Sequence, residues 1–321
     1  MSPMHTIDKT LIGQLVKHVL VEVPTVKTPG IYFGMAGISI ALFEAAKVLE
    51  DKEVEERAFN LIQHALVSHS FDKSYESGLS GIGMALIYLI QRNFLEADFN
   101  ELFSDKLQLI LNAYEKVDLQ PNILLSTTRV VQFLSAVKPL SDKSEIQSVI
   151  NKFLQGIELF LSIQFFDWRD PHYIGKKQLV IKIFNTYLQL VKATDYKHHS
   201  KTLLQTYLKL FKEERIASSI QLGSSLSAIA EMDGNYEYQD VIDENIRYGL
   251  KDIYISHLFL DEQISIFTAI SLLPKEYTSL HRLILSQKLI PNLHPNTPPS
   301  SLHGGLSGWI LYLCNPQNGL L

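Results

Sequence analysis

The sequence of 321 residues has a single cysteine, Cys314, and no long uninterrupted hydrophobic run. One cysteine excludes an intrachain disulfide, so the chain cannot have the disulfide framework of many small secreted domains. No apolar stretch approaches the roughly 20 residues that a membrane-spanning helix needs. The N-terminal segment carries charges among its apolar positions, unlike the hydrophobic region of a signal peptide. We therefore expect a soluble, cytoplasmic protein without a membrane span.

Charge of one sign is not concentrated anywhere along the chain. The 29 Lys and Arg residues and the 34 Asp and Glu residues are interspersed, and the net charge is −5. A nucleic-acid-binding surface needs clustered Lys and Arg, so we expect no nucleic-acid partner. The sequence also lacks the G-x-G-x-x-G, P-loop, H-E-x-x-H and nucleophile-elbow motifs, which excludes the functions that these motifs indicate.

The sequence does have apolar residues at helical spacing along nearly its whole length. Examples are ISIALFEAAKVL (residues 38–49) and EERAFNLIQHALVSH (residues 55–69). No turn sequence separates β-rich runs as it would in hairpins. Hydrophobic residues make up 46% of the chain, which is enough for a sizeable core. The pattern predicts an all-α protein.

Three segments repeat a Gly-x-x-Gly turn that is followed at once by an apolar helix. Their glycine pairs are Gly34–Gly37, Gly78–Gly81 and Gly305–Gly308. Gly37 and Gly81 are 44 residues apart, and Gly308 lies 227 residues after Gly81, which is close to five more steps of about 45. This spacing predicts four further units with weaker turns. We place these turns near Thr128, Gly175, Ala228 and Ser265.

The repeated turn also predicts how each unit is built. Glycine allows close backbone approach at the helix entry, and the N–H groups of the first helical turn should face an open site. The helix over 38–49 is apolar nearly all round and should be buried, whereas the segment 51–66 has one charged face and should lie outside it. Seven such pairs predict an α/α toroid of about seven inner and seven outer helices. It would form a single domain over residues 1–321, with the last unit packed against the first.

With its GMAG turn and two GLSG turns, the chain resembles the lanthionine synthetase C-like (LanC-like) proteins. The resemblance covers nearly the whole chain and implies the toroid fold. It also implies peptide chemistry, in which a cysteine thiol of a precursor peptide adds to a dehydrated serine or threonine. In the family, a zinc ion held by two cysteines and one histidine of the fifth and sixth units activates the thiol. A histidine in the fourth-unit turn assists proton transfer.

This chain departs from the family at the zinc site. The segments expected for the fifth-unit and sixth-unit turns, GSSLSA and QISIFT, contain neither cysteine nor histidine. A two-cysteine site cannot form within a chain that has only Cys314, and we expect this residue to be a small buried hydrophobe. The resemblance makes zinc the one cofactor to consider, and the family ligands for it are absent. We therefore expect no cofactor.

Three residues are candidates for a catalytic site. His303 stands just before the last glycine turn and is expected at the mouth of the ring, where it could bind a metal or exchange protons. Otherwise it packs or caps its loop. His172 and Asp167 lie in the polar stretch 165–175, near the place of the family's fourth-unit histidine. The alternative for this stretch is a surface loop with local ion pairs.

Two adjacent histidines, His198 and His199, stand among charged residues and are expected to face solvent.

Three functions are compatible with the sequence. The first is a LanC-like protein of lanthipeptide-type modification that has lost zinc-dependent cyclase activity and binds a precursor peptide or a peptide-modifying enzyme. The second is an active cyclase-like enzyme with a site that does not use cysteine. The third is a carbohydrate-active α/α toroid, which would need two carboxylates across a cleft. Asp167 and Asp170 are the only clustered candidates for that pair.

Overall fold

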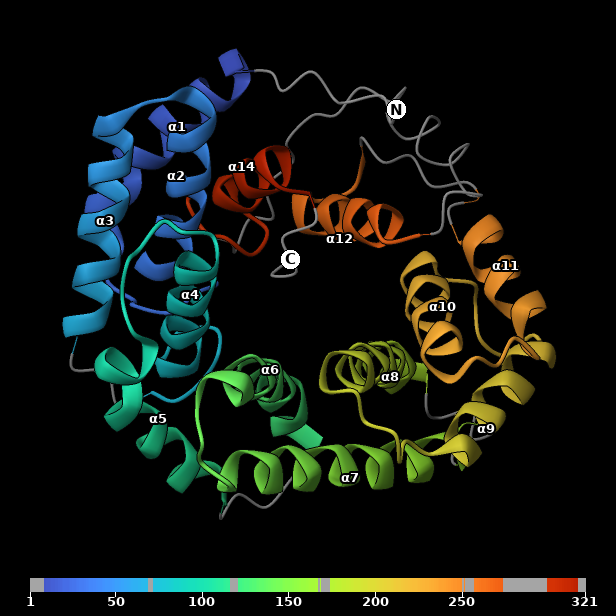
Figure 1. Cartoon of the computed structure of the whole chain (residues 1–321). Helices are drawn as coiled ribbons and strands as arrows, with labels where there is room; N and C mark the ends of the chain where they lie inside the picture. Colours follow the sequence, from blue (N-terminus) through green and yellow to red (C-terminus); the bar gives the residue numbers. More distant parts are fainter. Residues whose placement is uncertain are drawn as a thin grey trace. The chain divides into compact units, whose positions relative to one another are not determined.

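The computed structural model describes residues 9–68, 72–115, 121–166, 168, 174–249, 251, 257–273 and 299–316. Within these ranges the regular elements are helical and no strand is present, which confirms the all-α prediction for this part of the chain (Figure 1). The α-helices are α1 (Lys9–Glu22), α2 (Met35–Leu49), α3 (Lys52–Val67), α4 (Leu79–Gln91), α5 (Phe99–Glu115), α6 (Pro121–Val137), α7 (Glu145–Phe166), α8 (Ile174–Thr194), α9 (Lys201–Lys212), α10 (Ile220–Asp233), α11 (Gln239–Tyr248), α12 (Leu260–Ser271) and α14 (Leu306–Cys314). Two short 3-10 helices, Val23–Thr25 and Lys138–Leu140, follow α1 and α6.

The chain divides into two compact units. The first contains Met1–Ile110 and Tyr254–Leu321, and the second contains Leu111–Ile253. The first unit thus combines the beginning and the end of the sequence. Helices α12 and α14, from the end of the chain, pack in the same unit as α1 to α4.

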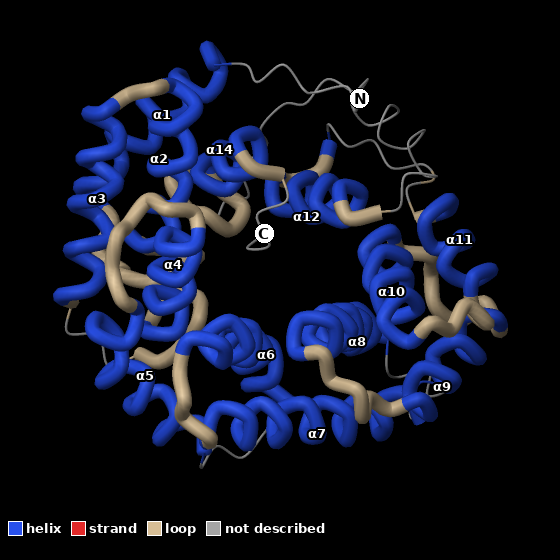
Figure 2. The backbone as a smooth tube through the Cα atoms, viewed as in Figure 1, coloured by secondary structure: helices blue, strands red, loops and turns tan. Residues whose placement is uncertain are grey.

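Helices of the first unit form two layers. In one layer α12, α14, α2 and α4 lie side by side in this order (Figures 1 and 2). Helices α1 and α3 pack against α2 from the second layer. Every residue of α2 from Ala36 to Ala46 is buried, whereas α3 buries only the stripe that contains Val54, Ala58 and Leu61. The apolar and amphipathic patterns of the sequence therefore correspond to these two layers.

Helices of the second unit follow the same alternation. Helix α8 packs between α6 and α10, while α7 packs across α6 and α8, and α9 contacts both α7 and α11. Polar contacts fix some of the junctions. The Tyr187 hydroxyl on α8 donates to Oε1 of Glu158 on α7 at 2.5 Å, and the same oxygen accepts the N–H of Ser200, the N-cap of α9, at 3.1 Å.

Seven helices begin at intervals close to the predicted repeat length of about 45 residues. Helices α2, α4, α6, α8, α10, α12 and α14 begin at residues 35, 79, 121, 174, 220, 260 and 306, which gives intervals of 40 to 53 residues. The turn predicted near Gly175 agrees with the start of α8 at Ile174.

Three of the predicted weaker turns were placed wrongly. Thr128, Ala228 and Ser265 all lie inside helices α6, α10 and α12. The reason is that caps other than glycine pairs set these helix starts. Helix α6 begins with a proline, which suits the first helical position. Before α12, the backbone N–H of Phe259 donates to Oε2 of Glu262 at 2.9 Å.

The start of α10 is fixed from a neighbouring helix. The Oδ1 atom of Asn245, a fully buried residue of α11, accepts the N–H of Ser219 at 2.9 Å. Its Nδ2 donates to the carbonyl of Val241 at 2.9 Å. Because Ser219 is the N-cap of α10, this buried amide takes the place of the glycine turn that we had expected further along the chain.

The expectation for the two adjacent histidines was half wrong. His198 is exposed, but His199 is only 7% exposed. Its Nδ1 lies 3.1 Å from the carbonyl oxygen of Tyr196 and its Nε2 lies 3.0 Å from Oδ2 of Asp233. Both ring nitrogens of the buried His199 therefore have polar partners.

None of the described helices combines the length and the apolar composition required to cross a bilayer.

Candidate functional site

The three glycine turns share one backbone geometry. In each, the first N–H of the helix donates to the carbonyl seven residues earlier in the chain. These bonds are Met35 to Thr28 at 2.9 Å, Leu79 to Asp72 at 2.9 Å, and Leu306 to Pro299 at 2.6 Å. The glycine before each helix is its N-cap and has an extended backbone. The preceding residues therefore arch over the helix entry in the same way three times.

The second glycine of each pair is required by close approach of the arch. A Cβ atom on Gly37 would lie 1.7 Å from the carbonyl oxygen of Ile31, a residue of its own arch. The corresponding distance is 2.0 Å for Gly81 and 2.1 Å for Gly308. The repeated glycines thus make room for a carbonyl group, and positive φ angles are not the reason for them.

The expectation of open N–H groups at these helix entries was wrong for α2. The N–H groups of Met35, Ala36 and Gly37 donate to the carbonyls of residues 28, 29 and 30, at 2.9, 3.2 and 3.4 Å. The arch itself satisfies these donors. These three N–H groups of α2 are therefore not available to bind a ligand.

Backbone bonds also join the three arches to one another. The N–H of Tyr32 donates to the carbonyl of Glu76 at 2.9 Å. The carbonyl of Tyr32 in turn accepts the N–H groups of Leu302 and His303, at 2.9 and 3.2 Å. Together with the packing of α14 on α2, these bonds confirm that the last repeat lies against the first.

Aromatic side chains gather where the arches meet. We call Tyr32, Phe33, Tyr75 and His303 the turn cluster. The exposed ring of His303 stacks on Tyr32, with centroids 4.5 Å apart and planes 12° apart, and lies edge-on to the half-buried Phe33 at 6.2 Å. Tyr32 is 4% exposed and contacts the fully buried Tyr75 in a T-shaped pair at 5.5 Å. His303 is therefore the accessible member of a stack that extends into the core.

A carboxyl group borders the turn cluster. Glu76 is next to Tyr75 in the second arch and is half-buried. Burial raises the pKa of the Glu76 carboxyl, and the nearby charge of Asp72 adds to this, while a backbone hydrogen bond acts in the opposite direction. This residue was not among the candidates from the sequence.

The three predicted site residues have different outcomes. His303 lies at the arches, and its stacking on Tyr32 agrees with the packing role that was the alternative to a catalytic one. His172 and Asp167 lie outside the described residues, as does Asp170.

A second polar cluster lies near the far ends of α2, α4 and α14. We call Glu44, Tyr88, Arg92 and Asn315 the Glu44 network. The Tyr88 hydroxyl donates to Oε1 of Glu44 at 2.5 Å, and Arg92 binds both carboxylate oxygens through Nε at 2.8 Å and Nη2 at 3.1 Å. Asn315 Nδ2 lies 2.9 Å from the Tyr88 hydroxyl oxygen and 3.4 Å from Glu44 Oε1. Glu44 is 1% exposed.

Burial and hydrogen bonds together shift the pKa values of Tyr88 and Arg92 in this network. Desolvation raises the pKa of Tyr88, and the hydrogen bond and charge of Glu44 raise it further. The hydrogen bond to Glu44 is the main reason why the pKa of Arg92 is raised. A carboxylate with a bidentate guanidinium and a neutral phenol is a satisfied buried ion pair.

Reasoning from the sequence missed the Glu44 network, although a signal for it was present. Glu44, Tyr88 and Asn315 each stand seven residues after the second glycine of their turn. An alignment of the three repeats would have shown a polar residue at the same position in each.

Cys314 does not form a metal site with His303. The two residues lie at opposite ends of α14, whose nine residues span about 13 Å. Burial, followed by the charge of Glu44, raises the pKa of the Cys314 thiol to about 12. The thiol is therefore protonated at neutral pH, unlike a zinc-bound thiolate. In the parts of the chain described above, no group of three or more His, Cys, Asp or Glu residues could hold a metal ion.

Comparison of the sequence with protein-family models found no match, and comparison with curated proteins found none either.

Proposed function

We propose that this protein is a LanC-like protein of peptide modification that binds a precursor peptide, or an enzyme that modifies it, without zinc-dependent cyclase activity. The observation that carries the proposal is the threefold repetition of one arched glycine turn before an apolar helix. Such turns are the feature through which the sequence resembles the family. The proposal includes a closed α/α toroid. The seven helices that begin 40 to 53 residues apart support it, as does the contact between the last and the first repeat.

The state of the cysteine supports binding over cyclase chemistry. A cyclase of the family type needs a metal-activated thiol on the substrate and protein thiolates to hold the metal. Cys314 has a raised thiol pKa and lies one helix length away from His303. Cys314 and His303 therefore cannot supply the two cysteines and one histidine of the family's zinc site.

The turn cluster is the place where we propose that the peptide binds. His303 presents an exposed imidazole on an aromatic support, and Phe33 adds a half-buried apolar edge. The Glu76 carboxyl lies in the adjacent arch. Peptides offer apolar side chains and amide groups, for which aromatic faces, an imidazole and a carboxyl are suitable partners.

Peptide retention on the immobilised protein tests this role. A pool of random-sequence decapeptides is passed over the wild-type protein and over a Tyr32→Leu/His303→Ala variant, and retained peptides are identified by mass spectrometry. We expect a subset that only the wild type enriches. A Lys17→Met variant on the exposed face of α1 is the matched control and should retain the same subset.

A thiol assay separates binding from catalysis. A linear peptide with one dehydroalanine and one cysteine is incubated with the protein and zinc, and the free thiol is followed over time. We expect the rate of the uncatalysed reaction. Faster thiol loss that disappears in the His303→Ala variant would instead support the cyclase-like enzyme. Equal peptide retention by the wild type and the double variant would remove the turn cluster as the binding site.

A further inference from the structure

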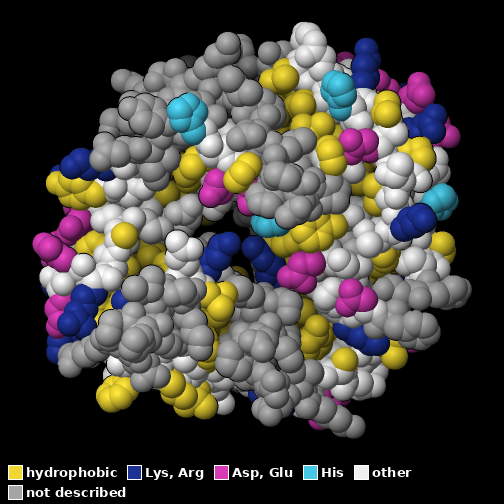
Figure 3. Space-filling model, turned by 180° about the vertical axis from the view of Figure 1, so that it is seen from behind, with side chains coloured by type: hydrophobic (Ala, Val, Ile, Leu, Met, Phe, Trp, Pro, Cys, Tyr) yellow, Lys and Arg dark blue, Asp and Glu magenta, His cyan; other side chains and the backbone are white. Residues whose placement is uncertain are grey.

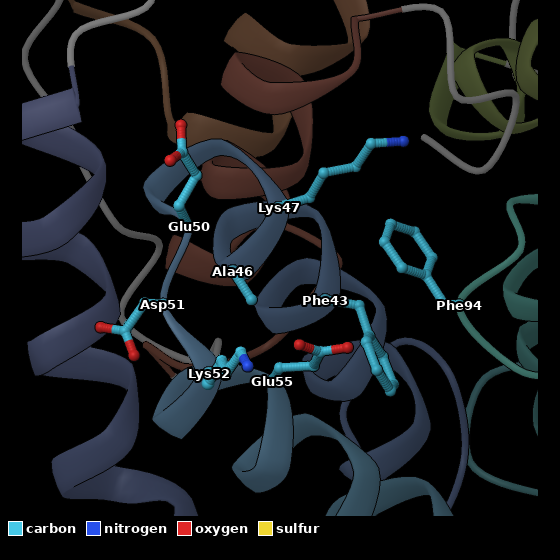
Figure 4. Close-up of a pocket in the computed structure, with 8 residues that line it drawn as sticks. All are labelled: Phe43, Ala46, Lys47, Glu50, Asp51, Lys52, Glu55 and Phe94. Atoms are coloured by element: carbon cyan, nitrogen blue, oxygen red, sulfur yellow. The ribbon is translucent and has the colours of Figure 1, made fainter.

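A cavity of about 340 Å³ opens beside the C-terminal half of α2, at the other end of that helix from the turn cluster (Figure 4). Its floor is apolar and consists of Phe43, Ala46 and Phe94. Phe43 is 2% exposed, and its ring stacks on that of Phe94 with centroids 5.3 Å apart and planes 28° apart. Such a rigid aromatic floor favours binding of a small apolar group, because the group leaves water without disturbing the core.

The acidic residues at the rim of the cavity are engaged elsewhere. The Asp51 carboxylate accepts the N–H groups of Glu53 and Val54, at 3.0 and 3.2 Å, and so caps α3. Glu50 pairs with Lys9 at 3.5 Å. In Figure 4 the side chains of Glu50 and Asp51 both point away from the two phenylalanines. These two carboxylates therefore do not define what the cavity binds.

One ammonium group of the cavity lining lies over the aromatic floor. Lys52 and Glu55 are three residues apart on α3 and so share a face of that helix. Lys47 Nζ lies 5.5 Å from the centroid of Phe94. Among the described residues, no carboxylate oxygen is recorded within 4.0 Å of this Nζ atom. Lys47 is thus the cation that lies at the aromatic floor.

We propose that this cavity binds a small apolar carboxylate. The apolar body lies on Phe43 and Phe94, and the carboxylate pairs with Lys47. A free organic acid and the C-terminal residue of a peptide share this chemistry. The site is independent of the peptide-binding role of the turn cluster, which involves other residues at the opposite end of α2.

Charges of both signs are present on the face of the protein shown in Figure 3. On the face shown in Figure 3, Lys and Arg side chains alternate with Asp and Glu side chains. A general attraction for anions is therefore not expected, and binding of a carboxylate should depend on the one lysine at the apolar floor.

Titration with 3-phenylpropionate, followed by saturation-transfer NMR, tests the proposal on the full-length protein. We expect saturable binding that weakens about fivefold in Lys47→Met, since one partly exposed ion pair is lost while the apolar stem remains. The neutral amide 3-phenylpropanamide should bind the wild type more weakly by a similar factor. Lys17→Met is the control, because Lys17 is exposed on α1 and does not line the cavity.

A Phe94→Leu variant provides a second test that changes the floor and keeps its apolar character. We expect weaker binding of 3-phenylpropionate, since the aromatic stack on Phe43 is lost. Displacement of the probe by an N-acetylated tripeptide ending in phenylalanine would identify peptide C-termini as the source, and the absence of displacement would identify free acids. Equal binding of acid and amide, or unchanged binding in Lys47→Met, would overturn the proposal, as would the absence of saturation.

Discussion

Glu44 and Tyr88 stand one repeat apart in the sequence, and their side chains meet in the structure. The two residues are separated by 44 positions, and the hydroxyl of Tyr88 donates to Oε1 of Glu44 at 2.5 Å. Asn315, at the same position of the last repeat, completes the contact. Equivalent positions of the first, second and last units therefore contact one another through polar groups.

Removing the charge of Glu44 should destabilise the protein. In Glu44→Gln, Arg92 loses a charged partner and a bidentate contact, and we expect the free energy of unfolding to fall by about 1–3 kcal/mol. Urea denaturation followed by circular dichroism measures the change. Glu53→Gln is the control, because its ion pair with Arg57 is exposed and 3.7 Å long, and its effect should stay within about 0.5 kcal/mol. Equal effects of the two variants would show that the network is not a stabilising contact.

Alanine at the second glycine of a Gly-x-x-Gly turn should destabilise the protein, whereas alanine at Gly13 should not. Gly37→Ala forces a Cβ against the Ile31 carbonyl, so we expect a loss of about 3 kcal/mol or more. Gly13 lies inside α1, and a Cβ there meets no atom within 4 Å. Gly13→Ala should raise stability by about 0.5–1 kcal/mol. A Gly37→Ala protein with wild-type thermal stability would contradict the arched turn.

The stack of His303 on Tyr32 should contribute modestly to stability. We expect His303→Ala to lower the free energy of unfolding by about 0.5–1.5 kcal/mol, and His303→Phe to restore most of it, because phenylalanine can stack in the same place. A double-mutant cycle with Tyr32→Leu measures the coupling. Additive effects of the two single substitutions would mean that the rings do not interact in solution.

Cys314 should be unreactive in the folded protein. With a pKa of about 12, its thiolate fraction at pH 7.5 is below about one in ten thousand, against about one-tenth for a free thiol of pKa near 8.5. We expect iodoacetamide to label the chain in urea and to leave it unlabelled without denaturant. Rapid labelling of the native protein at pH 7.5 would contradict the protonated state of this thiol, which is half-buried and not, as the sequence led us to expect, fully buried.

The same raised pKa predicts an alkaline limit to stability. Below about pH 8.5 the thiol is protonated in both the folded and the unfolded chain, so its contribution is constant. Above that pH the unfolded chain loses the proton first, and stability falls until the folded pKa is reached. Cys314→Ala should therefore reduce the loss of thermal stability between pH 8 and pH 10.

The sequence was most informative where physical causes are local. Apolar periodicity indicated the helices, and the Gly-x-x-Gly turns indicated three of the helix entries, because only glycine leaves room for the arched carbonyl at Gly37, Gly81 and Gly308. The contact between the last and the first repeat was also predicted, because a ring of repeats places its last unit against its first.

Prediction failed where a distant residue determines the local structure. The start of α10 depends on Asn245, which is 26 positions away in the chain from Ser219. The burial of His199 depends on Asp233, 34 positions away. The partners of Glu44 lie on two other helices, so a single apolar segment such as 38–49 gives no sign of them. Contacts of this kind are recognisable in one sequence only when equivalent positions of the repeats are compared.

The central proposal is that this protein works without the zinc of the LanC-like family that its sequence resembles, and its metal content tests that proposal most directly. The protein is expressed with zinc supplied, purified without chelator, and analysed by elemental mass spectrometry beside its His303→Ala variant. We expect no stoichiometric zinc in either protein. About one zinc per chain in the wild type, lost in His303→Ala, would contradict the claim and show that a site had been rebuilt from other ligands.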